Sequence, residues 1–173
     1  RFAFSYAWWT AYGFKRRVHE DDLSACEEMK LIDQKAVYDS VGGKVRESVL
    51  DGDAVVLFAY GLSGSGKTFT VFGPDAIDAP EAWFKHMEPI DMWGLLPRVA
   101  YDIFKLKSDG WSIKMKYFQN VVDIVRDLMD PVGQEQSYKA GMRKDKDGFM
   151  DIEWCKAVPL KDWEDMTKKF MEA

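Results

Sequence analysis

The chain contains 173 residues, of which 47% are hydrophobic and 31% are charged, and it has a formal net charge of −5. This length predicts one domain, spanning residues 1–173, with one core. The acidic balance argues against a nucleic-acid binder, because phosphate backbones favour a basic surface. Cys26 and Cys155 lie far apart, which predicts neither a disulfide framework nor a zinc site and favours a reducing, cytosolic setting.

The amino-terminal segment predicts a strand followed by a charged stretch. Aromatic residues alternate with smaller ones over residues 2–8, as in a short strand, and the mixed charges of residues 15–30 favour a solvated loop or short helix. The start at Arg1, without a methionine or a signal-peptide pattern, predicts a piece of a longer polypeptide. No apolar run approaches the ~18 residues that cross a bilayer, so we expect no membrane contact.

The next segment predicts a helix, a turn and a buried strand. Apolar residues at helical spacing predict a helix over residues 33–50, which the pair Gly42-Gly43 weakens. Asp51-Gly52 predicts a turn. The continuous apolar run of residues 54–60 is typical of a strand covered on both faces, as in parallel sheets.

A complete Walker A pattern follows this run: Gly61-Leu62-Ser63-Gly64-Ser65-Gly66-Lys67-Thr68. Glycines let the backbone curl so that successive N–H groups point at phosphate oxygens, and the following helix presents its N-terminus to the same anion. We expect Lys67 to reach the β- and γ-phosphates of ATP and the Thr68 hydroxyl to ligate Mg²⁺. The sequence therefore predicts a nucleotide site.

The segment after the Walker A pattern predicts two helices, a loop and a strand. A helix should start after Thr68, and the three prolines and several acids of residues 73–93 favour a long surface loop. Helical periodicity returns over residues 95–104. The alternation over residues 111–118 predicts a half-buried strand.

The carboxyl-terminal third predicts short elements and a last helix. Residues 121–129 favour a short helix, residues 131–146 a loop, and residues 149–158 one or two short strands. Apolar residues over 163–171 predict an amphipathic helix that is capped by Asp162.

Beyond the Walker A pattern, many stretches resemble a kinesin motor domain, in the family's order and at its usual intervals. They are Val37-Tyr38-Asp39, Ser48-Val49-Leu50-Asp51-Gly52, Leu57-Phe58-Ala59-Tyr60-Gly61, Phe69-Thr70-Val71-Phe72-Gly73, Gly94-Leu95-Leu96-Pro97-Arg98, Tyr117-Phe118, Val125-Arg126-Asp127-Leu128 and Trp163-Glu164-Asp165-Met166. The opening residues 2–9 are similar to a segment of the cargo-transporting third subfamily.

This resemblance implies an α/β P-loop NTPase fold, with part of the mixed central sheet of kinesins flanked by helices. It implies ATP and Mg²⁺ as cofactors, Lys67 as a catalytic residue, and Phe69 beside the adenine. Arg143, Lys144 and Lys146 fall in the loop that kinesins present to the acidic microtubule, although an ordinary exposed basic loop explains them equally well. The implied location is the cytoplasmic microtubule cytoskeleton, with cilium and spindle left open.

The chain departs from the family pattern in several places. Leu62 and Ser63 replace the usual Gln and Thr, and residues 119–123 replace Glu-Ile-Tyr-Asn-Glu, which questions the packing of that hairpin. The adenine strand and the two switch signatures, which hold Mg²⁺ and position the attacking water in the family, do not occur in the chain. We therefore expect the segment to need the rest of its motor domain for hydrolysis and to bind nucleotide weakly by itself.

Two other patterns are not assigned as sites. Asp123 follows two valines like a Mg²⁺-binding acid but is better explained as a structural or surface residue. Residues 145–151 are similar to a calcium loop, yet Arg143 and Trp154 occupy its ligand positions.

Three functions stay open from the sequence. They are an active ATP-driven microtubule motor, a static kinesin-fold microtubule-binding or scaffold subunit with decayed hydrolysis, and an unrelated P-loop NTPase. The intact Lys67 and Thr68 favour retained nucleotide binding.

Overall fold

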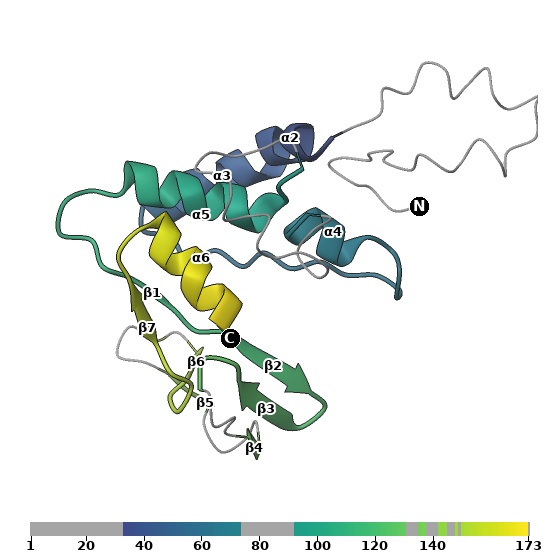
Figure 1. Cartoon of the computed structure of the whole chain (residues 1–173), viewed down its shortest axis with the longest axis vertical. Coiled ribbons are helices and arrows are strands. Elements are labelled where there is room, and N and C mark those ends of the chain that lie inside the picture. Colours follow the sequence, from purple (N-terminus) through teal and green to yellow (C-terminus); the bar gives the residue numbers. More distant parts are fainter. Residues whose placement is uncertain are drawn as a thin grey trace, which may run out of the picture. The chain divides into compact units, whose positions relative to one another are not determined.

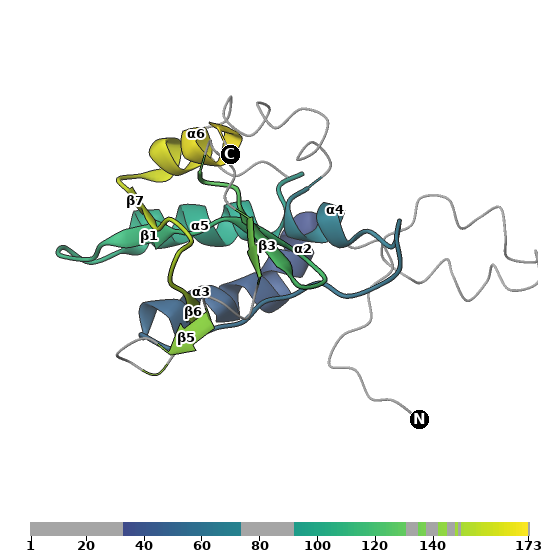
Figure 2. The same cartoon turned by 90° about the horizontal axis from the view of Figure 1, so that it is seen from below.

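The computed structural model describes residues 33–73, 92–130, 135–137, 142–144, 148 and 150–172 (Figures 1 and 2). The chain divides into two compact units, one formed by residues 1–76 with 89–99 and the other by residues 77–88 with 100–173. The strand predicted over residues 2–8 and the charged stretch over residues 15–30 lie outside the described residues. Within the described part, no helix combines the length and apolar character that a membrane span requires.

The first unit starts with one continuous helical stretch that comprises α2 (Gln34–Val37), the π-helical η3 (Tyr38–Gly42) and α3 (Gly43–Leu50). Asp33 caps it, because its carboxylate accepts the backbone N–H of Ala36 at 2.7 Å. The predicted helix is confirmed, and Gly42 does not break it. The ring of Tyr38 lies so close that a Cβ at position 42 would be 2.2 Å from a ring carbon. The stretch ends at the predicted turn Asp51-Gly52.

The strand predicted over residues 54–60 is wrong for the chain as the structure describes it. These residues have no strand partner among the described residues, and all of them are exposed. Val56, Phe58 and Tyr60 expose 85%, 79% and 93% of their surface. A strand requires a neighbour that pairs with its backbone, and burial requires elements that cover its faces. An apolar run supplies neither by itself.

The first unit continues with α4 (Lys67–Val71) and the start of α5 (Leu95–Leu106). Both predicted helices are confirmed. Trp93 is buried at the entry to α5, where its carbonyl accepts a hydrogen bond from Arg98 Nε at 2.9 Å. Gly73 and Trp93 are buried, so the ends of the predicted surface loop are not on the surface, and residues 74–91 lie outside the described residues.

Among its described residues, the second unit holds three small antiparallel sheets: β1 (Ile113–Met115) with β7 (Val158–Leu160); β2 (Phe118–Val121), β3 (Ile124–Asp127) and β4 (Glu135–Ser137); and β5 (Met142–Lys144) with β6 (Met150–Ile152). The single strand predicted over residues 111–118 is divided, since β1 and β2 pair with different neighbours. The predicted loop over residues 131–146 contains β4 and β5, whereas the strands predicted over residues 149–158 are confirmed as β6 and the start of β7.

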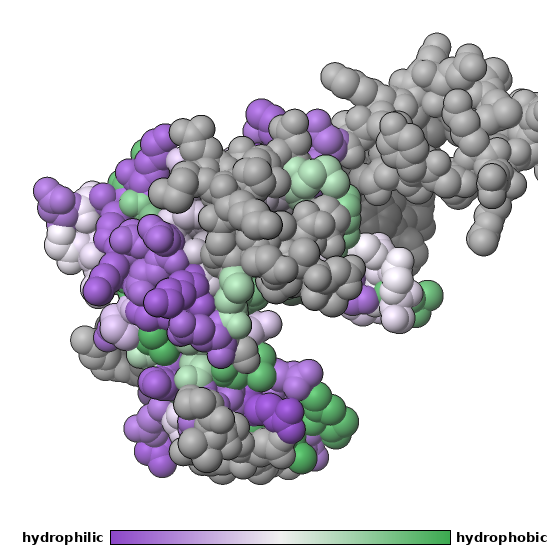
Figure 3. Space-filling model, viewed as in Figure 1, coloured by the Kyte–Doolittle hydropathy of each residue, from purple (hydrophilic) through white to green (hydrophobic). Residues whose placement is uncertain are grey.

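The short helix predicted over residues 121–129 is wrong, because β2 and β3 form a hairpin (Figure 1). Val121 pairs with Ile124 across a two-residue turn, in which Val122 has a φ of 55°. Positive φ is unusual for a β-branched residue. The exposed Val121, Val122 and Ile124 form the green patch at the hairpin end in Figure 3. β-Branched residues favour strands over helices, which explains the outcome.

Helix α6 (Trp163–Glu172) closes the second unit and lies against β7 (Figure 1). The predicted cap is confirmed, since the N–H of Asp165 donates to the Asp162 carboxylate at 2.8 Å. The Trp163 ring meets Tyr101 of α5 edge to face, with ring centroids 6.0 Å apart. Cys155 is a buried free thiol whose pKa is raised by burial, and Cys26 lies outside the described residues.

Lys116 and Asp151 form an ion pair between the β1–β2 connection and β6. Lys116 Nζ donates to both carboxylate oxygens, at 2.7 and 2.8 Å, and to the Ile152 carbonyl at 2.8 Å. This bond holds the pKa of Asp151 below its ordinary value of 3.8, against an opposing effect of burial. Asp151, the last residue of the calcium-like pattern over residues 145–151, is thus paired with Lys116.

We predict that the Lys116–Asp151 pair makes stability depend on acid pH. Because the pKa of Asp151 is lower in the folded than in the unfolded chain, the ion pair stabilises the fold fully at pH values above the ordinary pKa of 3.8. This stabilisation is lost as the pH falls through the pKa of the folded state. At neutral pH, Asp151→Asn should lower the free energy of unfolding by about 1 kcal/mol or less, because the Asp151 side chain is 46% exposed. Urea unfolding at about pH 7 and pH 3 should show this difference shrinking. The exposed control Asp109→Asn should change little, and a difference that grows in acid would contradict the prediction.

Candidate nucleotide-binding site

The phosphate loop connects residues 54–60 to α4, and its backbone is curled. Gly64 and Gly66 have φ values of 75° and 89°, where a side chain would strain the backbone. The N–H of Ser65 donates to the Leu62 carbonyl at 3.1 Å and closes a turn. Gly66 then accepts the N–H of Thr70 at 2.8 Å as α4 begins. The glycines of the motif thus occupy the positions where this curl requires them.

The ammonium group of Lys67 is held over the start of the loop. Its Nζ donates to the Gly61 carbonyl at 3.0 Å and to the Leu62 carbonyl at 2.8 Å. Both acceptors are neutral backbone groups, and a phosphate oxygen at the same donor would form a stronger, charge-assisted hydrogen bond. The arrangement therefore places one cation where the loop can share it with an anion.

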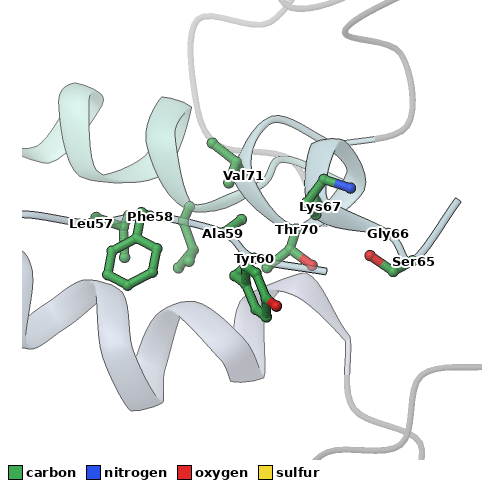
Figure 4. Close-up of a pocket in the computed structure, with 10 residues that line it drawn as sticks. Leu57, Phe58, Ala59, Tyr60, Ser65, Gly66, Lys67, Thr70 and Val71 are labelled. Carbon is green, nitrogen blue, oxygen red and sulfur yellow. The ribbon is translucent and has the colours of Figure 1, made fainter. Parts of the chain in front are cut away.

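A pocket of about 240 Å³ lies between residues 57–60 and α4 (Figure 4). Lys67, Thr70 and Val71 line it from α4, and Ser65 and Gly66 from the loop. Its volume is below the roughly 300–1,000 Å³ of sites that enclose a whole small ligand. The pocket is therefore too small to enclose a whole nucleotide.

Thr68 and Phe69 face solvent and do not line this pocket. Phe69 exposes 42% of its surface, and Thr68, which follows Lys67 directly, is also exposed. Within the described ranges, no group of three or more His, Cys, Asp or Glu side chains is arranged to hold a metal ion. Mg²⁺ in nucleotide sites takes few protein ligands and several from phosphate and water, so one threonine hydroxyl fits that role.

The predicted microtubule residues lie in the second unit. Arg143 and Lys144 are exposed on strand β5 instead of in a loop, and Lys146 lies outside the described residues. Arg143 forms an ion pair of 3.4 Å with Glu153, and both side chains are more than two-thirds exposed (73% and 68%). Such a surface pair is weak and leaves the cation open to another acidic partner.

Sequence reasoning missed two residues that support α4. Gly94 lies against the end of α4, where an added Cβ would be 2.6 Å from backbone atoms of Val71 and Phe72. Its N–H donates to the Phe72 carbonyl at 3.1 Å. The side chain of Gln34 donates to the Phe69 carbonyl. The kinesin-like stretch around Gly94 was a signal for the first, whereas a glutamine at a helix start gave no signal for the second.

A curled glycine-rich loop that leads into a helix carrying Lys67 and Thr68 defines a protein of the P-loop NTPase class. The chain belongs to the kinesin motor domain family, because the model of that family, "Kinesin motor domain", matches residues 11–173. A solved structure described as that of a fast kinesin agrees, with a TM-score of 0.64 at 20% identity over 82% of this chain and 37% of the other. This likeness shows that the fold is shared.

Curated relatives include kinesins from several animals. Human kinesin-like protein KIF13A is 28% identical over 156 residues, which is 87% of this chain and 7% of the relative. Kinesin-like protein unc-104 of Caenorhabditis elegans is 32% identical over 106 residues, 58% of this chain and 6% of the relative. Kinesin heavy chain of Strongylocentrotus purpuratus is 34% identical over 56% of this chain and 9% of its own length. The first two fit the resemblance to the third subfamily, and the chain spans only a small part of each relative.

Proposed function

We propose that this chain is the ATP-binding part of a microtubule-based motor that couples ATP hydrolysis to movement along microtubules. The observation that carries the proposal is the curled phosphate loop, with the Lys67 ammonium held across it, in a chain of the kinesin motor domain family. Kinesin relatives and the intact Lys67-Thr68 pair support it further.

Each residue of the loop has a role in this proposal. The backbone N–H groups of residues 61–66, apart from that of Ser65, which closes the turn onto Leu62, bind phosphate oxygens. Lys67 shifts its ammonium from two carbonyls to the β- and γ-phosphates. The Thr68 hydroxyl holds Mg²⁺, which neutralises phosphate charge, and the exposed Phe69 ring borders the adenine. Groups aimed at phosphate oxygens gain in strength as charge develops there, so the same contacts that bind ATP lower the barrier to hydrolysis.

Hydrolysis is proposed to require the rest of the motor domain. The family's switch signatures, which position the attacking water, do not occur in this chain. The exposed apolar residues 54–60 support this view, because their backbone, which pairs with no strand of the described part of the chain, suits strands from the rest of the same motor domain. We place the full protein on cytoplasmic microtubules, where Arg143, Lys144 and Lys146 meet the acidic surface of tubulin.

Co-sedimentation with microtubules tests the proposed function. The full-length protein should pellet more strongly with a non-hydrolysable ATP analogue than with ADP. In a motor, the nucleotide at one site changes the affinity of the other site for microtubules, and such coupling typically amounts to a factor of about 5 to 150. Equal pelleting with both nucleotides would identify a static microtubule binder. No pelleting with either would refute the microtubule assignment.

The same assay examines the basic residues of β5. The double variant Arg143→Ala and Lys144→Ala should pellet less with both nucleotides, since it removes two exposed cations from the proposed contact. Lys35→Ala is the matched control, because it also removes an exposed lysine, here from an ion pair within α2 and η3.

A further inference from the structure

A buried polar side chain connects α2 to the helix that carries Lys67 and Thr68. Gln34, the first residue of α2, exposes only 5% of its surface. Its Nε2 donates a hydrogen bond to the carbonyl oxygen of Phe69 in α4, 35 residues further along the chain. Buried amides require hydrogen-bond partners, so this contact fixes both groups.

The acceptor lies near the C-terminal end of α4. The last carbonyls of a helix have no partner within it, and Phe69 is among the last residues of α4. Its carbonyl accepts the N–H of Gly73 at 2.9 Å in addition to the Gln34 amide. With five residues, α4 is too short to be stable alone, so its direction depends on the groups that contact it.

The donor is held firmly on its own side. The Asp33 carboxylate caps α2 at the Ala36 N–H, and Val37 is buried one turn after Gln34. The helical stretch continues through η3 and α3 up to Leu50. The backbone of Gln34 is therefore held in place at the capped start of this helical stretch, so its side chain can fix the position of α4.

We infer that Gln34 is a positioning residue of the nucleotide site. Lys67 and Thr68 immediately precede Phe69 in α4, so a tilt of this helix moves the ammonium and the hydroxyl together. Gln34 acts through the backbone of α4, because its amide donates to the Phe69 carbonyl. This inference rests on the proposed nucleotide-binding function.

The test replaces Gln34 by leucine, which is of similar size and has no donor, in the full-length protein. The Kd of a fluorescent ATP analogue should rise about tenfold, as expected for the loss of one buried hydrogen bond. The kcat of ATP hydrolysis should fall as well, because small displacements of charged groups slow the chemistry. Gln119→Leu, on the exposed strand β2, is the matched control and should stay within about twofold of the parent.

Binding is measured at a temperature at which circular dichroism shows every variant to be folded. A lower melting temperature with a Kd within about twofold of the parent would mean a purely structural role and overturn the inference. If the leucine variant does not fold, Gln34→Asn takes its place, since its amide is one methylene too short to reach Phe69; an unchanged Kd there also overturns the inference. A parent protein that binds no ATP analogue refutes the proposed function and the inference with it.

Discussion

Replacing Lys67 by alanine should reduce microtubule-stimulated ATP hydrolysis by the full-length protein to background. Loss of one preorganised charge-stabilising group typically costs about 100- to 1,000-fold in kcat. Lys67 is the one side chain of the Walker A pattern that carries a positive charge, and its Nζ already lies across the loop at the Gly61 and Leu62 carbonyls. Phosphate release with and without microtubules measures the effect.

The fold should survive this change, which separates catalysis from stability. Lys67 is partly exposed and its two acceptors are exposed carbonyls that water can satisfy. Lys67→Arg should not restore activity, because a planar guanidinium does not reproduce a compact ammonium. Lys35→Ala, which removes an exposed i,i+4 pair with Asp39, is the control and should keep full turnover. Unchanged turnover in Lys67→Ala would contradict the motor proposal.

The elements that were predicted correctly are those in which a local pattern determines the structure. Helix α6 follows from apolar spacing and the Asp162 cap, and α5 from its periodicity, since neither depends on a distant partner for its type. The strand predicted over residues 54–60 and the helix predicted over residues 121–129 were wrong for the opposite reason. Short apolar runs fit a strand or a helix, and pairing or burial by other segments decides between them.

The residues of the candidate site likewise fall into those that a local pattern predicts and those that depend on a distant contact. Lys67 and Thr68 could be assigned from the Walker A pattern, because the chemistry requires those residue types at that spacing. Gln34 could not, since its importance arises from a contact with a residue 35 positions away and from burial at 5% exposure. Outside the site, the ion pair of Lys116 with Asp151 could not be predicted either, because it also joins residues 35 positions apart.

Asp127 occupies a kinesin-like stretch whose function the sequence alone did not reveal. Its side chain is buried, at 3% exposure, at the end of β3. One carboxylate oxygen accepts the N–H of Met129 at 2.9 Å, and the other accepts the N–H of Lys156 at 2.7 Å. The second bond joins segments 29 residues apart. The carboxylate therefore ties β3 to the connection between β6 and β7.

Asp127→Ala should lower the free energy of unfolding by about 3 kcal/mol, because hydrogen bonds to a charged group contribute about 1.5–3 kcal/mol each and two backbone donors lose their acceptor. Asp127→Asn keeps one acceptor oxygen and should lose about half as much. Urea unfolding measures both, with Asp123→Ala in the exposed hairpin turn as the control. If Asp127 holds these segments together, its loss leaves two backbone N–H groups without their acceptor and must lower the free energy of unfolding. Equal free energies of unfolding for Asp127→Ala and Asp123→Ala would therefore contradict this role.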